Sequence, residues 1–125
     1  MDKVVHFEIP VDDLERAKGF YASVFGWGVQ TLEEMDYTIA MTTAIDQQTQ
    51  VPLEPGAVNG GIMRRTDATP APVITIQVGA IDEALKRVEA EGGGTVRPCT
   101  EIPGMGAFAY FKDSEGNVLG LWETA

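Results

Sequence analysis

The sequence predicts an α+β fold built from two copies of one module, a strand followed by a helix and about three short strands. Residues 4–27 pass from a β-branched strand into an amphipathic helix, and residues 73–94 repeat that passage. The two halves also align residue by residue, with Ile9 on Ile76 and Val11 on Val78. Because one such module cannot bury its own sheet, we expect the two to pair with their helices outside.

The first module opens with a strand at residues 4–9, which Pro10 is expected to stop because it lacks a backbone donor. Asp12 is the expected helix N-cap, with Glu15 placed three residues later for a capping box. Gly26 follows the last periodic residue and is expected to end the helix. The helical stripe consists of Leu14, Ala17, Tyr21, Val24 and Phe25.

The rest of the first module alternates short strands with loops. Residues 37–43 alternate most clearly and place Tyr37, Ile39 and Met41 on one face. The stretch 45–58 is rich in glutamine and proline, lacks periodicity and is expected to be a long exposed loop. Further short strands are predicted at 29–31 and 59–64.

The second module has the same order with shorter loops. A strand at 73–78 leads into a helix whose stripe contains Leu85 and Val88 and which the glycines at 92–94 end. Near the C-terminus the alignment places Gly61 on Gly120 and Met63 on Trp122. The predicted single domain therefore comprises module one (1–65), a linker (66–71) and module two (72–125), with its last strands at 95–97, 106–111 and 118–122.

Composition excludes several classes of function. The formal net charge of −10 argues against nucleic-acid binding, which requires a basic patch, although it permits a cationic ligand. The sequence lacks an apolar run of membrane-spanning length, so we expect a cytoplasmic protein without a membrane partner. Cys99, the single cysteine, cannot form an internal disulfide and has no histidine nearby in sequence, so we expect an inert thiol.

Two stretches, HFEIPVDDLERAKGFYASVFGW and FKDSEGNVLGLW, resemble the vicinal oxygen chelate superfamily. That superfamily includes glyoxalase I, bleomycin-resistance proteins and extradiol dioxygenases. The resemblance covers nearly the whole chain. It implies a glyoxalase-like fold, in which two βαβββ modules form a cup-shaped mixed sheet with helices outside, and it also implies a homodimer.

The resemblance further implies four positions at which enzymes of the superfamily hold a divalent metal through His, Glu or Gln. His6 matches the first position with a suitable side chain. Val73, Gly61 and Gly120 match the other three, and none of them has a donor atom on its side chain. Since catalytic metal sites use about three protein ligands, we expect neither a bound metal nor another cofactor.

The function predicted from this pattern is metal-free binding of a small organic molecule in the cup. The alternative is a divalent-metal-dependent lyase, isomerase or dioxygenase, in which Glu8 or a dimer partner adds ligands to His6. A metal-free enzyme with His6 as base and Glu8 as its orienting group is a third reading. No catalytic residue is assigned. The predicted ligand-binding residues are His6, Glu8, Gly61, Met63, Val73, Thr75, Gly120 and Trp122.

Overall fold

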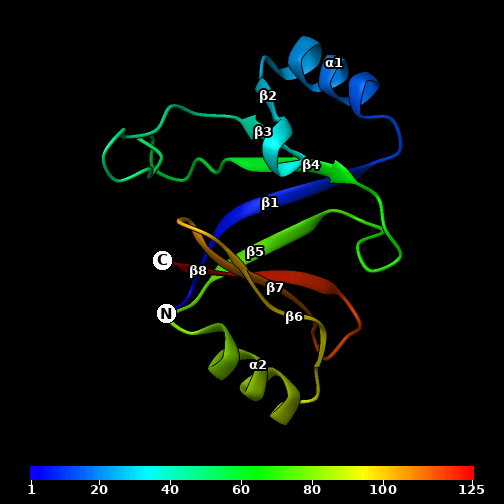
Figure 1. Cartoon of the computed structure of the whole chain (residues 1–125), viewed down its shortest axis with the longest axis vertical. Coiled ribbons are helices and arrows are strands. Elements are labelled where there is room, and N and C mark those ends of the chain that lie inside the picture. The colour runs from blue at the N-terminus through cyan, green and yellow to red at the C-terminus, as the bar shows by residue number, and fades with distance from the viewer. The chain divides into compact units, whose positions relative to one another are not determined.

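A computed structural model describes residues 1–125 and divides them into two compact units (Figure 1). The N-terminal unit comprises residues 6–72, and the C-terminal unit comprises residues 73–125 together with residues 1–5. Each unit has the predicted order of strand, helix and three strands, which confirms the α+β class. The elements are β1 (Lys3–Val11), α1 (Leu14–Phe25), β2 (Gly28–Leu32), the 3-10 turn η1 (Glu33–Met35), β3 (Tyr37–Met41), β4 (Gly60–Arg64), β5 (Val73–Gln77), α2 (Ile81–Ala90), β6 (Gly94–Ile102), β7 (Gly106–Lys112) and β8 (Val118–Thr124).

In the N-terminal unit the strands lie in the order β2-β3-β4-β1, with β1 parallel to β4 and the other neighbours antiparallel. Pro10 does not stop β1 as the sequence suggested. It lies opposite Met63 in the parallel ladder, and the strand runs on to Val11. The ladder survives because the Val11 carbonyl beyond the proline accepts a hydrogen bond from the Arg65 backbone N–H at 2.9 Å.

The N-cap of helix α1 lies one residue later than predicted. Asp13 is the N-cap and its side chain accepts the Arg16 N–H, whereas Asp12 forms an ion pair with Arg65 at 3.0 Å. At the other end Gly26 is the expected stop, with a left-handed φ of 71° that a residue without Cβ adopts freely.

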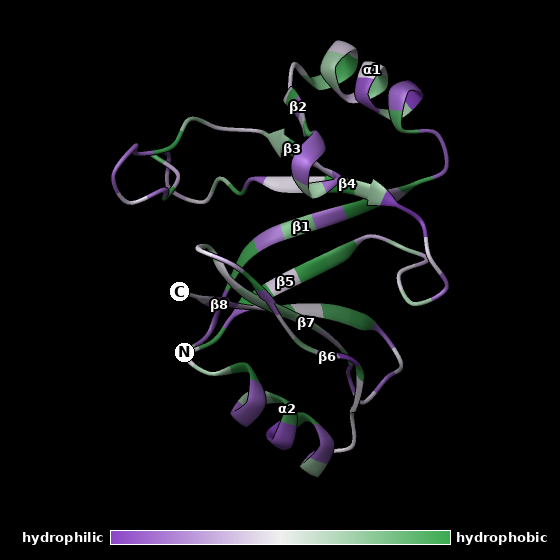
Figure 2. Cartoon of the chain, in the orientation of Figure 1, coloured by the Kyte–Doolittle hydropathy of each residue, from purple (hydrophilic) through white to green (hydrophobic).

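The apolar stripe of α1 is less buried than its pattern indicates, since the helix has no fully buried residue. Val24 and Phe25 remain 56% and 60% exposed, and green apolar positions are visible on α1 in Figure 2. The aromatic side chains of this helix contact one another, and Tyr21 stacks on Trp27 at 4.8 Å between ring centroids. Trp27 in turn meets Phe7 of β1. Neither α1 nor α2 is long and apolar enough to span a membrane.

The C-terminal unit has the strand order β5-β8-β7-β6, with β5 parallel to β8 and the other neighbours antiparallel. Helix α2 supplies Ile81, Ala84 and Leu85 to the core on one face of this sheet. The Glu123 carboxylate accepts the Ile81 N–H at 3.0 Å and so replaces the capping side chain that Ala80 lacks. The core is completed by Val78, Ala107, Ala109, Phe111 and Leu121.

Strand β6 is three times longer than the 95–97 predicted from sequence. Its pairing with β7 shifts register twice, first between Thr95 and Arg97 and then between Arg97 and Thr100. Each shift adds a residue to β6 opposite β7, which is the definition of a bulge. Arg97 therefore stands between two bulges, and a single-residue step in register changes the face that a side chain occupies.

The two units also share the pairing of residues between their parallel strands. In the N-terminal unit Glu8 of β1 lies opposite Gly61 of β4, and in the C-terminal unit Thr75 of β5 lies opposite Gly120 of β8. The sequence alignment related Gly61 to Gly120, and the ladders now relate Glu8 to Thr75 in the same way. Equivalent positions of the two units thus place a glycine beside a buried polar residue.

Candidate functional site

The helix-free sheet face of the N-terminal unit gathers a histidine, a tyrosine and a carboxylate. Phe7 contacts Trp27, which stacks on Tyr21 of α1, so the strand alternation places His6 and Glu8 on the opposite face. The His6 Nε2 atom is 2.8 Å from the Tyr37 hydroxyl. Glu8 is 9% exposed and lies opposite Gly61. His6 is therefore a half-buried histidine with a hydrogen-bond partner, Tyr37.

Tyr37 occupies the space that a side chain at position 61 would need. A Cβ built on Gly61 would collide with the Tyr37 hydroxyl and its ring. Burial and the charge of Glu8 raise the pKa of Tyr37 well above its ordinary value, so the phenol stays protonated at neutral pH. Alternation along residues 37–43 places Tyr37 on a strand face, but no local pattern links it to His6, because the pairing of β3 with β4 and of β4 with β1 sets that contact.

His6 should make the protein less stable in mild acid. Burial lowers the pKa of His6 below 6.5, so the unfolded chain takes up a proton at pH values where the folded chain does not. The free energy of unfolding is expected to fall as the pH drops below about 6.5. His6→Gln, which does not titrate and can still bond the Tyr37 hydroxyl, should reduce this loss. Denaturant titrations of both proteins between pH 8 and 5 test the expectation, and parallel curves would contradict it.

The helix-free face of the C-terminal unit is crossed by two rows of residues that lie opposite one another on neighbouring strands. One row runs Thr75, Gly120, Tyr110 and Arg97 from β5 to β6, and the next runs Gln77, Trp122, Phe108 and Thr100. The neighbouring residues Ala107, Ala109 and Phe111 point to the α2 core instead. Gly120 and Trp122 share a face, as their spacing predicted.

Thr75 carries a polar atom without a partner. Its side chain is 5% exposed and its hydroxyl forms no hydrogen bond. A Cβ on Gly120 would lie 2.7 Å from that oxygen, so the Thr75 side chain packs directly on the glycine. Buried hydroxyls are nearly always paired, so this unpaired one makes the Thr75–Gly120 pair a candidate for contact with a ligand.

The eight residues predicted to bind a ligand fall into two groups of four. His6, Glu8, Gly61 and Met63 belong to the N-terminal unit, and Val73, Thr75, Gly120 and Trp122 belong to the C-terminal unit. Within each group the ladders bring the polar residue and the glycine side by side. Val73 is 1% exposed and offers only hydrocarbon.

The residues present do not fit a catalytic divalent metal. Three of the four matching positions lack donors, and the only donor there, His6, is bonded to Tyr37 through a ring nitrogen that could otherwise ligate. No three His, Cys, Asp or Glu side chains are grouped closely enough to hold a metal ion. A site with about three protein ligands is therefore not assembled by this chain alone.

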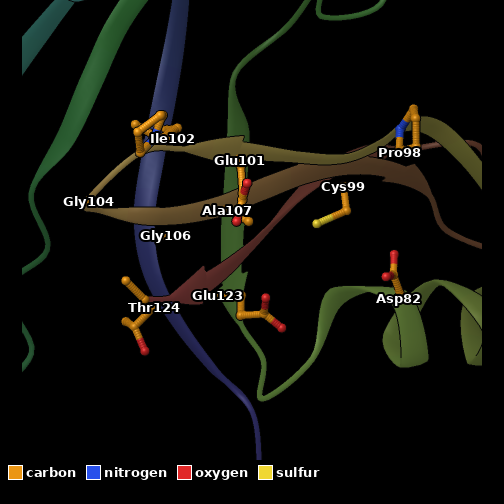
Figure 3. Close-up of a pocket in the computed structure, with 12 residues that line it drawn as sticks. Asp82, Pro98, Cys99, Glu101, Ile102, Gly104, Gly106, Ala107, Glu123 and Thr124 are labelled. Carbon is orange, nitrogen blue, oxygen red and sulfur yellow. The ribbon is translucent and has the colours of Figure 1, made fainter.

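The C-terminal unit also contains a cavity of about 750 Å³ whose lining includes none of the predicted residues (Figure 3). Asp82, Glu101 and Glu123 line it together with Cys99. Desolvation and these three carboxylates raise the pKa of the Cys99 thiol. Because the thiolate is the reactive form, this environment is consistent with the inert thiol expected from the sequence.

Comparison with protein families and curated sequences finds relatives named for glyoxalase-type proteins. The family model for the bleomycin resistance protein-like N-terminal region matches residues 3–43. "Putative glyoxylase CFP32" of Mycobacterium bovis is 27% identical over 120 residues, covering 93% of this chain and 43% of that protein. The chain thus spans less than half the length of this relative. A "Glyoxylase-like domain-containing protein" of Didymella fabae is 28% identical, covering 91% of this chain and 88% of that protein.

Solved structures share the fold at low sequence identity. A variant of Streptomyces coelicolor methylmalonyl-CoA epimerase in complex with 2-nitronate-propionyl-CoA matches with a TM-score of 0.64 and 17% identity, over 98% of this chain and 97% of that one. The hypothetical protein BH1468 of Bacillus halodurans matches with a TM-score of 0.62 and 16% identity, over 99% and 95% of the two chains. These matches confirm the glyoxalase-like fold class.

Proposed function

We propose, from the premise that this chain belongs to the vicinal oxygen chelate superfamily, that it is a metal-free protein which binds a small organic molecule. The helix-free faces of its sheets are the proposed binding surfaces. The observation that carries the proposal is the contact of Tyr37 with both His6 and Gly61, because it puts a phenol where a metal ligand of the superfamily would stand.

The arrangement suits binding better than metal chemistry. In the N-terminal unit His6 and Tyr37 offer a linked pair of hydrogen-bonding groups, and in the C-terminal unit the unpaired Thr75 hydroxyl offers another. Trp122 and Phe108 lie opposite each other on β8 and β7 and provide an aromatic surface. A largely apolar surface with few polar anchors is typical of small-molecule sites. A neighbour by fold, the epimerase from Streptomyces coelicolor, was solved with an organic coenzyme A derivative, which agrees with this class of ligand.

The proposal predicts that protein purified without added metal contains far less than one metal ion per chain. Binding of a neutral aromatic probe, 2-naphthamide, should be measurable by calorimetry. His6→Ala should weaken that binding roughly tenfold, the contribution of one hydrogen bond, and should leave the metal content unchanged. Elemental analysis and titration of both proteins provide the measurements.

The opposite result would favour the metalloenzyme. Stoichiometric zinc, nickel, iron or manganese in the purified protein, lost in His6→Ala together with an enzymatic activity, would overturn the proposal and support a metal-dependent lyase, isomerase or dioxygenase. A homodimer and a cytoplasmic location stay predictions from the sequence. Light scattering at micromolar concentration that gives a monomer mass would contradict the dimer.

A further inference from the structure

The two bulges of β6 determine which way Arg97 points. Thr95 lies opposite Phe111, a residue of the α2 core. Regular antiparallel pairing would continue by placing Arg97 opposite Ala109, which is also in that core. The first bulge instead places Arg97 opposite Tyr110, on the helix-free face. Bulges frequently re-aim a side chain beside a functional site, and here the re-aimed side chain is a guanidinium.

On that face the guanidinium is held in place by an aromatic ring. The central carbon of the Arg97 guanidinium lies 5.0 Å from the centre of the Phe108 ring, within the range of a cation–π contact. Its Nε donates to the Thr100 hydroxyl at 3.3 Å. The two terminal nitrogens form no ion pair or hydrogen bond within the chain. A stacked guanidinium of this kind keeps its outer edge available for a carboxylate or phosphate.

The charge around Arg97 differs in sign from the charge of the whole protein. The formal net charge is −10, yet Arg97 is the only charged residue in the two rows that cross this face. Glu101 lies opposite Ala107, and Glu123 caps α2, so both carboxylates belong to the other face. A ligand beside the Phe108 ring therefore meets the positive charge of Arg97 with no acidic competitor in the rows.

We propose that the ligand of this face is an aromatic or similarly apolar anion, whose acidic group binds Arg97 while its body rests on Phe108 and Trp122. Phe108 contacts the guanidinium and lies opposite Trp122, so the cation and the two rings are contiguous. Opposite residues on neighbouring strands lie about 5 Å apart, and a planar molecule of two fused rings covers that span. The inference rests on the proposed binding function and adds the charge of the ligand to it.

The test compares two probes that share a ring system and differ in charge, 2-naphthoate and 2-naphthamide. Calorimetry at pH 7 and low salt should show that the full-length protein binds the carboxylate roughly tenfold more tightly than the amide, since charge-assisted hydrogen bonds are the stronger ones. Arg97→Met, which keeps an unbranched stem and removes the charge, should abolish the difference. Arg87→Met is the matched control because Arg87 is exposed on α2 and also lacks an ion pair.

The other outcomes distinguish a failure of the Arg97 inference from a failure of the proposed binding function. Equal binding of the two probes, or a preference that survives in Arg97→Met, would overturn the role of Arg97 and leave the binding function standing. An equal loss of both probes in Arg97→Met would show that Arg97 acts by packing on Phe108, which also overturns the inference. Binding of neither probe would overturn the proposed function and the inference with it. Salt offers a check without a variant, because added NaCl should weaken naphthoate binding and spare naphthamide.

Discussion

Gly60→Ala should lower the free energy of unfolding by about 3 kcal/mol, the cost of overpacking a well-filled interior. A Cβ at this position would lie 2.6 Å from two ring carbons of Phe7 and would also collide with the Phe7 backbone carbonyl. The ring could rotate away, but the carbonyl belongs to β1, which pairs with β4 at this point. Relief therefore requires that two paired strands separate. Denaturant unfolding monitored by circular dichroism measures the change.

Gly19→Ala is the matched control for this substitution. Gly19 lies within α1, is exposed, and a Cβ there would have nothing within 4 Å. The same added methyl group should stabilise the protein by about 0.5–1 kcal/mol, because alanine loses less backbone entropy in a helix. If both variants shifted in the same direction, the close approach of Phe7 to Gly60 would not be the controlling contact.

Thr75→Val should raise the free energy of unfolding of the ligand-free protein by about 1–3 kcal/mol. The substitution keeps the shape of the side chain and removes a buried hydroxyl that has no hydrogen-bond partner. An unsatisfied buried polar group costs its full desolvation, and an apolar group of the same shape does not. Stability gained at Thr75 together with weaker probe binding would be the trade-off expected of a binding residue.

The comparison is Thr38→Val in the N-terminal unit. Thr38 is 1% exposed, but its hydroxyl is 3.1 Å from that of Thr31. Removing this partnered hydroxyl should destabilise the protein by about 1 kcal/mol. The changes in the free energy of unfolding are expected to have opposite signs for the two substitutions. A loss of stability in both would mean that the Thr75 hydroxyl has a hydrogen-bond partner in solution.

Local signals in the sequence were sufficient for the order of elements but not for their limits. The repeat of strand and helix was readable because periodicity, Gly26 and the turn residues act over a few positions. Pro10 was misread as a stop, since the backbone of Arg65, far along the chain, carries the ladder past it. The length of β6 was missed for a related reason: its two bulges hide the alternation on which a strand prediction depends.

The candidate site was predictable where it follows from alternation within a strand and unpredictable where it follows from pairing between strands. His6 and Glu8 share a face by simple period-two geometry. Tyr37 reaches His6 and Gly61 only because β3, β4 and β1 are neighbours, and no local pattern indicates that. The face on which Arg97 lies is set by a bulge, so a prediction from regular strand alternation would place its side chain on the opposite face of the sheet.

The contact between Tyr37 and Gly61 also bears on how this chain could change by mutation. A glutamate at position 61 would supply a donor of the kind that metal-dependent members of the superfamily use, but its first carbon would meet the Tyr37 hydroxyl. A smaller residue at position 37 would in turn leave His6 without its partner. Each single substitution is therefore unfavourable by itself, and even the paired change would add one donor to His6, fewer than the roughly three protein ligands of a catalytic metal site. Positions 37 and 61 therefore constrain each other, and a substitution at either one is disfavoured unless the other changes with it.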